Sequence, residues 1–142
     1  MTRKPLATLL VDGQCGVCCW GGIHLAARID GLAVATIQQG LQRELAALGQ
    51  RRALASWHLV EPGRIASGAD VVPALLELAG HSGGAALGRA LLPLLRPAYR
   101  SLAATRTLWA RAVPADRRTA ARARLAAQGP LLVAARARLP NQ

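Results

Sequence analysis

Short apolar runs separated by turn residues dominate the first half of the chain. Leu6 to Val11 and Leu32 to Ile37 are rich in aliphatic residues, which predicts two buried strands. Between them, small and apolar residues from Cys15 to about Ile29 predict a helix. Gly21 and Gly22 oppose this helix, because a glycine in a helix interior costs about 1 kcal/mol relative to alanine.

The middle of the chain predicts a further helix and a hairpin. Leu41 to Leu48 is typical of a helix that Gly49 ends. Ala53 to Val60 alternates as a half-buried strand does. Pro62-Gly63 then supplies the fixed and the positive φ of a type II turn, and Arg64 to Ala66 returns as the second strand. The predicted order up to this point is β-α-β-α-β-β.

The second half of the chain is predicted to be helical. Asp70 is expected to cap the next helix, because Pro73 then falls in the first turn, where its missing N–H breaks no helical bond. Prolines divide the helical segments that follow, and Ala115 to Gln128 is helical by propensity. We expect one domain over residues 1–114 and a loosely attached, basic Arg/Ala-rich tail over residues 115–142.

Composition limits the chain to one aliphatic core. A length of 142 residues suits a single domain, and the chain has no Phe and only 3% aromatic residues. No uncharged apolar stretch approaches the roughly 18 to 20 residues that cross a bilayer. Leu6 to Val11 is shorter than the core of about 7 to 15 residues that a signal peptide needs. A membrane-spanning or secreted protein is therefore not expected.

Positive charge is concentrated in the C-terminal half. The net charge is +11 at pH 7, and residues 71–142 carry eleven arginines against two acidic residues. Such a half attracts phosphates of lipid or nucleic acid, and the run Leu91 to Leu95 suits a membrane surface. A solvated helical face is the plainer interpretation. Only Tyr99 and Trp109 are available to stack on bases here, so no specific nucleic-acid partner is expected.

The three cysteines form a candidate redox site. Cys15, Cys18 and Cys19 lie within five positions, so they cannot crosslink distant parts of the fold, and we expect a reducing, cytoplasmic location. A C-x-x-C motif at the start of a helix places Cys15 where the helix dipole stabilises a thiolate. Cys18 follows one turn later and can close a disulfide that expels a bound partner. Cys15 is the candidate nucleophile and Cys18 the resolving thiol.

Other interpretations of this motif need different residues. A structural zinc site needs four ligands, and no second C-x-x-C or H-x-x-x-H accompanies the first. A c-type haem needs His where Cys19 stands. We therefore expect neither a metal nor another cofactor. Two buried, inert cysteines remain an open alternative, because thiols also act as small core residues.

A resemblance adds to this interpretation. Leu9 to Cys18, L-L-V-D-G-Q-C-G-V-C, resembles the opening of the DCC family of predicted thiol-disulfide oxidoreductases, in which Asp12, Cys15 and Cys18 match the signature D-G-x-C-x-x-C. The resemblance implies a thioredoxin-like α/β fold, with a small central sheet, flanking helices and an extra helical C-terminal region. No proline precedes the strand predicted near Ala53, so the cis-Pro that docks substrate in thioredoxins is missing.

The remaining candidates have weaker patterns. Asp12, as a third site residue, either tunes or relays a proton for a cysteine, or bonds nearby N–H groups as a turn residue. Cys19 is expected to fill the core. The three histidines lack a catalytic pattern and are expected to be structural or solvent-facing: His24, His58 and His81. Trp20 and Trp57 are expected to pack in the core, which we favour over a place beside the dithiol.

Two functions follow from these features. The first is a thiol-disulfide oxidoreductase that acts on an unidentified protein disulfide or small thiol through Cys15 and Cys18. The alternative is a non-catalytic thioredoxin-like interaction module. It would bind an acidic partner, a lipid surface or nucleic acid through the arginine-rich C-terminal half.

Overall fold

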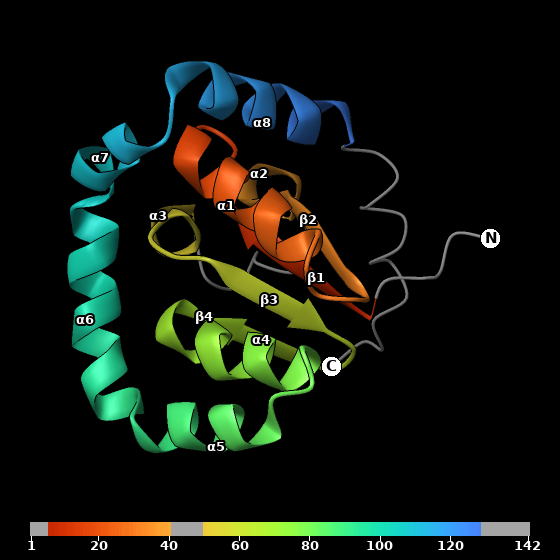
Figure 1. Cartoon of the computed structure of the whole chain (residues 1–142), viewed down its shortest axis with the longest axis vertical. Coiled ribbons are helices and arrows are strands. Elements are labelled where there is room, and N and C mark those ends of the chain that lie inside the picture. The colour runs from red at the N-terminus through yellow and green to blue at the C-terminus, as the bar shows by residue number, and fades with distance from the viewer. Residues whose placement is uncertain (1–5, 41–49, 129–142) are drawn as a thin grey trace.

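A four-stranded mixed sheet forms the centre of the computed structural model, which describes residues 6–40 and 50–128 (Figure 1). The strand order is β2-β1-β3-β4. β1 (Ala7–Val11) pairs in parallel with β2 (Leu32–Thr36) and antiparallel with β3 (His58–Glu61), which forms a hairpin with β4 (Arg64–Ser67). This sheet with its flanking helices has the thioredoxin-like α/β architecture that the sequence predicts.

The two faces of β1 supply two separate parts of the core. Leu9 and Val11 are fully buried in a large cluster that includes residues of α1 (Gly16–Ala26) and α4 (Val71–Leu78). Leu10, between them, points to the other face and joins a smaller cluster with Ile37. Because successive side chains of a strand point to opposite faces, the unbroken apolar run of β1 indicates a strand covered on both sides.

A glycine lets α1 lie directly on the sheet. A Cβ added to Gly22 would stand 2.8 Å from Cγ2 of Val34 and 3.1 Å from Cγ1 of Val11. A Cβ on Gly21 would meet the Trp57 ring at 3.3 Å. The glycines that weaken α1 by propensity therefore allow its close packing, and tertiary contact outweighs the propensity cost.

A helix replaces the start of the third predicted strand. α3 (Gln50–Leu54) includes Ala53, which is fully buried in the smaller cluster, and β3 begins only at His58. The prediction of a strand from Ala53 is therefore wrong for its first half, because burial of Ala53 against the sheet decides the local structure. The predicted hairpin is confirmed as β3 and β4. The helix predicted over Leu41 to Leu48 lies outside the described residues.

His58 is a structural residue, as the sequence predicts. It is buried, with Nε2 at 2.8 Å from the Ala53 carbonyl oxygen and Nδ1 at 2.7 Å from Oγ of Ser67. Because a carbonyl only accepts, Nε2 carries the proton, and Nδ1 of the neutral ring accepts from the Ser67 hydroxyl. Burial lowers the pKa of His58, which favours this neutral form. The ring thus ties the end of α3 to β4.

The helices of the second half run around the sheet (Figure 1). They are the short 3-10 helix η2 (Gly68–Asp70), α4, α5 (Ser82–Ala90), α6 (Leu92–Ala104), α7 (Arg106–Trp109), the 3-10 helix η3 (Ala110–Ala112) and α8 (Ala115–Ala127). Asp70 directly precedes α4, as predicted, but its side chain makes no capping hydrogen bond and instead lies 3.4 Å from Nη2 of Arg96. Within the described residues, no helix is both long and apolar enough to cross a membrane.

The last described helix packs on α1. The helix predicted over Ala115 to Gln128 is confirmed as α8, and its Ala121 and Leu125 are buried in the large core cluster. A Cβ added to Gly16 would stand 2.7 Å from Cβ of Arg118, so α8 covers the first turn of α1. This helix is therefore not loosely attached. The domain boundary expected at residue 114 stays a prediction.

We expect Gly22→Ala to destabilise the protein. Overpacking against Val34 and Val11 costs roughly 1–3 kcal/mol, whereas the better helix propensity of alanine returns at most about 1 kcal/mol. Gly83→Ala in α5 is the matched control, because its Cβ would meet no atom within 4 Å. Urea denaturation should give a lower free energy of unfolding for Gly22→Ala and an unchanged or higher one for Gly83→Ala. An equal rise in the free energy of unfolding of both variants would contradict the close approach of α1 to the sheet.

Candidate active site

Cys15 occupies the N-cap position of α1. Its backbone is extended, with φ −93° and ψ 102°, and its carbonyl accepts the first helical bond from the Cys19 N–H at 3.0 Å. Its own N–H donates to the Asp12 carbonyl at 3.1 Å, which closes the loop between β1 and the helix. The thiol therefore lies at the positive end of the helix dipole, where unpaired N–H groups favour a thiolate.

Cys15 and Cys18 interact directly. The hydrogen bond from the Cys18 side chain is the main reason that the pKa of Cys15 falls to about 6. Partial burial opposes this shift, and the positive charge of Arg106 adds to it. The same hydrogen bond and burial raise the pKa of Cys18 far above its ordinary value. At neutral pH Cys15 is thus mainly a thiolate, and the Cys18 thiol donates a hydrogen bond to it.

Cys19 stands apart from this pair. Its side chain is fully buried in the large core cluster, and its thiol donates to the Asp12 carbonyl oxygen at 3.4 Å. Burial raises the pKa of Cys19 to about 11, so it remains a neutral thiol. The prediction that Cys19 fills the core is confirmed.

Asp12 organises the loop before the dithiol. Its Oδ1 accepts hydrogen bonds from the Gln14 backbone N–H at 3.0 Å and from Nε2 of Gln38 at 2.9 Å. The turn role proposed from the sequence is therefore present. The carboxylate also acts on the dithiol, because its negative charge raises the pKa of Cys15 as the smallest of the contributions to that shift.

Arg106 joins the loop and the dithiol from a distant part of the chain. Nη2 of Arg106, at the start of α7, lies 3.7 Å from Oδ2 of Asp12. Its positive charge lowers the pKa of both Cys15 and Cys18. In the sequence Arg106 is only one of the eleven arginines of residues 71–142, because its place beside the motif follows from how α6 and α7 wrap around the sheet.

Trp57 faces the dithiol from the segment before β3. Its side chain hydrogen-bonds Cys18 and lowers the pKa of that thiol, against the larger effects that raise it. Trp57 also packs on the large core cluster, so it both fills the core and flanks the dithiol. Trp20 instead stacks with His24, with ring centroids 4.2 Å apart. Across residues 6–40 and 50–128, no peptide bond is cis.

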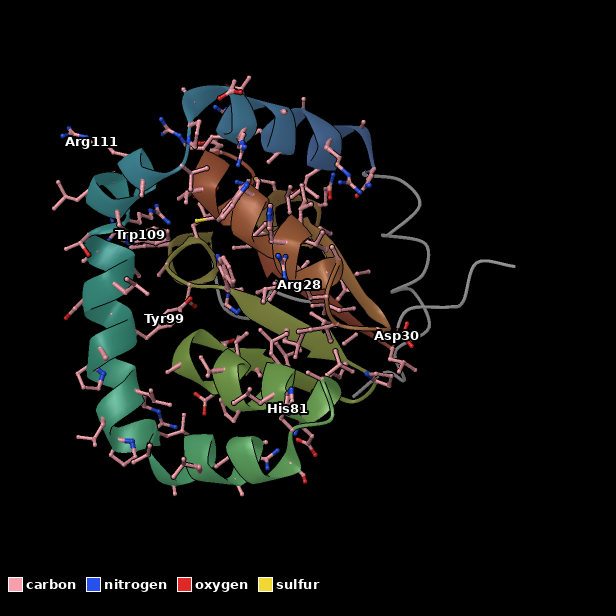
Figure 2. The ribbon with its side chains drawn as sticks, in the orientation of Figure 1. Arg28, Asp30, His81, Tyr99, Trp109 and Arg111 are labelled. Atoms are coloured by element: carbon pink, nitrogen blue, oxygen red, sulfur yellow. The ribbon has the colours of Figure 1, made fainter. Side chains whose placement is uncertain are left out.

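Tyr99 connects α6 to this segment. Its hydroxyl oxygen accepts a hydrogen bond from the Trp57 backbone N–H at 2.9 Å, and its side chain points from α6 towards the sheet (Figure 2). Burial raises the pKa of Tyr99, so the hydroxyl stays neutral. No local sequence pattern predicts a hydrogen bond between residues so far apart in the chain. The one hint is an aromatic residue in a helix that is otherwise rich in arginine and leucine.

A cavity of about 130 Å³ opens beside Cys18. Its lining comes from the loop after β1, the Leu54–Trp57 segment and α6 with α7: Asp12, Cys18, Leu54, Ala55, Ser56, Trp57, Tyr99, Leu102, Ala103, Arg106 and Trp109. No group of three or more metal-ligating side chains occurs in the part of the chain that the structure describes.

The chain matches a known protein family over most of its length. Residues 9–112 match the family described as DCC1-like thiol-disulfide oxidoreductase. This range contains the dithiol, Asp12, Trp57, Tyr99 and Arg106, so it covers the whole site and most of the chain. No curated protein and no solved structure gives a significant match.

The lowered pKa of Cys15 predicts a selective reaction with iodoacetamide. In the reduced, folded protein, the rate of labelling at Cys15 should rise through pH about 6, whereas an ordinary thiol responds near pH ~8.5. Cys18 and Cys19 should stay unlabelled at neutral pH, because they are buried thiols. Mass spectrometry of the labelled peptides measures this order. Labelling of Cys18 or Cys19 ahead of Cys15 would overturn the assignment.

Removing the charge of Asp12 should lower the pKa of Cys15 further. Asp12→Asn keeps an oxygen that accepts from Gln14 and Gln38, but it removes the negative charge that opposes the Cys15 thiolate. The midpoint of the alkylation profile should move to lower pH. Asp116→Asn, in the first turn of α8, is the matched control and should leave the midpoint in place. A midpoint that rises in Asp12→Asn would show that the effect of Asp12 on the loop conformation, and not its negative charge, controls the pKa of Cys15.

Proposed function

The chain belongs to the DCC1-like thiol-disulfide oxidoreductase family, and we propose that it exchanges disulfides with a protein or small-thiol substrate through Cys15 as nucleophile and Cys18 as resolving thiol. The observation that carries this assignment is the position of Cys15 at the N-cap of α1, with the Cys18 side chain donating to its sulfur. A thiolate that is accessible and stabilised is the species that attacks a disulfide.

The first step is attack by Cys15. With a pKa of about 6, Cys15 is mainly a thiolate at neutral pH. It attacks one sulfur of the substrate disulfide, whose S–S bond breaks as a new S–S bond to Cys15 forms. The departing sulfur leaves as a thiolate and takes a proton from water. The product is a mixed disulfide between Cys15 and half of the substrate.

The second step follows from the loss of charge on Cys15. The hydrogen bond to Cys15 and the negative charge of Cys15 are two of the causes that raise the pKa of Cys18, and both end when the mixed disulfide forms. Trp57 and Arg106 then favour the Cys18 thiolate. Asp12 lines the same cavity as Cys18, and we assign it the role of taking the proton.

Closure of the internal disulfide completes the exchange. The Cys18 thiolate attacks the Cys15 sulfur and expels the second substrate thiol. The substrate has then gained two electrons and the protein has lost two, so a reducing dithiol must restore it. A cytoplasmic location would supply such reductants, and it suits three neighbouring cysteines that cannot crosslink distant parts of the fold.

Trapping experiments test the division of roles. Cys18→Ser should react with glutathione disulfide, release one glutathione and retain the other on Cys15, because a serine hydroxyl in place of the resolving thiol cannot attack the mixed disulfide. Intact mass spectrometry should show one bound glutathione on nearly every molecule. Cys15→Ser should retain at least tenfold less. Cys19→Ser is the matched control and should form the Cys15–Cys18 disulfide like the wild type. A mixed disulfide that persists in Cys15→Ser and not in Cys18→Ser would reverse the assignment.

We also propose that the outer face of α5 to α7 binds anionic lipid surfaces. These helices expose several leucines and carry several arginines, and α6 has no fully buried residue. The exposed leucines outside the cavity lining are Leu87, Leu91, Leu94 and Leu108. Leucines that insert between headgroups, with basic residues beside them, are the features that hold a helix at such a surface.

Vesicle flotation tests this second function. Vesicles that contain phosphatidylserine should bind the protein at low salt and release it at high salt, because exposed charges are screened. Leu87→Gln with Leu94→Gln should reduce the bound fraction severalfold, since these two side chains are 61% and 69% exposed. Vesicles of phosphatidylcholine alone are the control. Absence of binding at low salt, or equal binding of both kinds of vesicle, would refute it.

A further inference from the structure

The cavity beside Cys18 continues into a larger cleft. The cleft has a volume of about 650 Å³ and lies between the Leu54–Trp57 segment, η2 and α6. It shares six lining residues with the smaller cavity: Leu54, Ala55, Ser56, Tyr99, Ala103 and Arg106. The two spaces therefore adjoin each other, and together they extend from Cys18 along α6; we refer to them together as the groove. Its larger part falls within the roughly 300–1,000 Å³ typical of sites for small ligands.

The chemistry of the groove changes along its length. Beside Cys18 the walls are mainly apolar and include Trp57, Leu102 and Trp109. Farther along α6 the lining includes Arg96 and Arg100, whose spacing of four residues places them on one face of the helix. Arg106 lines both parts. A molecule in this groove meets apolar surface near Cys18, the hydrogen-bond partner of Cys15, and positive charge farther away.

One arginine of the groove has its charge available. Arg96 lies 3.4 Å from Asp70, and Arg106 lies 3.7 Å from Asp12, so each has an acidic neighbour. Arg100 is exposed and, within the ranges that the structure describes, pairs with no carboxylate. Three arginines against two carboxylates leave the groove positive, with Arg100 as the group placed to accept a new anion.

The main chain beside the dithiol is already occupied. The Trp57 N–H donates to the Tyr99 hydroxyl at 2.9 Å, and the Trp57 carbonyl accepts from the Gly68 N–H at 3.0 Å. A substrate therefore finds neither group free for strand-like pairing at this residue. At this position recognition therefore falls to side chains, and the charge of the groove is available to choose the substrate.

We propose that the groove selects peptide-sized disulfides whose sulfur lies near apolar atoms and whose more distant end carries a carboxylate that binds Arg100. This inference rests on the proposed function and names its substrate class. The half of the substrate that becomes bonded to Cys15 lies in the groove, and its carboxylate pairs with the guanidinium of Arg100. The exchange itself uses the two balanced steps described above and needs no further reactant.

The rates of three disulfides test the proposal. Reduced protein is mixed with glutathione disulfide, which carries carboxylates, with neutral 2-hydroxyethyl disulfide, or with cationic cystamine. Each rate of thiol loss is divided by the rate of the same disulfide with a free small thiol, which removes its intrinsic reactivity. The corrected rates should fall in the order anionic, neutral, cationic, and the preference should weaken with added salt.

Arginine variants locate the preference. Arg100→Gln should lower the ratio of the glutathione disulfide rate to the cystamine rate by about two- to fivefold, the effect of one exposed ion pair, and Arg100→Glu should lower it more. Arg111→Gln removes the same charge from an exposed residue that points away from the molecule (Figure 2) and should leave the ratio unchanged. The ratio is insensitive to the reactivity of Cys15, which cancels.

The outcomes separate this inference from the proposed function. If Cys15 reacts with none of the three disulfides, the exchange reaction itself fails. If all three react equally, or if Arg111→Gln changes the ratio as much as Arg100→Gln, exchange stands and the groove does not select. A short cysteinyl peptide with Asp at the end distant from its disulfide should likewise react faster than its Lys counterpart, and the reverse order would overturn the proposal.

Discussion

The hydrogen bond from Cys18 to Cys15 holds a thiolate ready at neutral pH, and much of the structure serves to keep these two sulfurs in place. It requires α1 to begin immediately after Cys15, so that the second thiol follows one turn later. Gly22 lets α1 rest on β1 and β2. Asp12 fixes the loop before the helix, and its charge limits how far the pKa of Cys15 falls.

The helical second half completes the site as well as enclosing the fold. Arg106 brings positive charge to both cysteines, and Tyr99 anchors the segment that carries Trp57 against Cys18. α8 covers the first turn of α1 through Arg118. The groove beside Cys18 lies between α6 and the segment before β3, which Tyr99 ties together. Arginines that resemble a solvated surface in the sequence therefore also line the groove that we propose as the substrate site.

Local signals made the strand, the loop and the C-x-x-C helix predictable from the sequence, because an apolar run, turn residues and closely spaced cysteines each act within a few residues. The strand predicted from Ala53 failed where α3 buries that residue against the sheet. The sequence could not predict as a group the three residues that gather near Cys18, because their positions depend on tertiary contacts between distant segments: Trp57, Tyr99 and Arg106. Sequence therefore predicted that Cys15 and Cys18 lie close together with Asp12 beside them, and it missed Tyr99 and Arg106.

The pKa of Cys15 with and without its hydrogen-bond donor shows most directly whether Cys18 sustains the thiolate. A pH titration of thiolate absorbance in a Cys19→Ser background compares Cys18 with Cys18→Ala, which removes the donor and keeps the helix. We expect a midpoint near pH 6 with Cys18 present and a clearly higher midpoint in Cys18→Ala. The same midpoint in both proteins would contradict this, because the Cys15 thiolate would then owe nothing to Cys18.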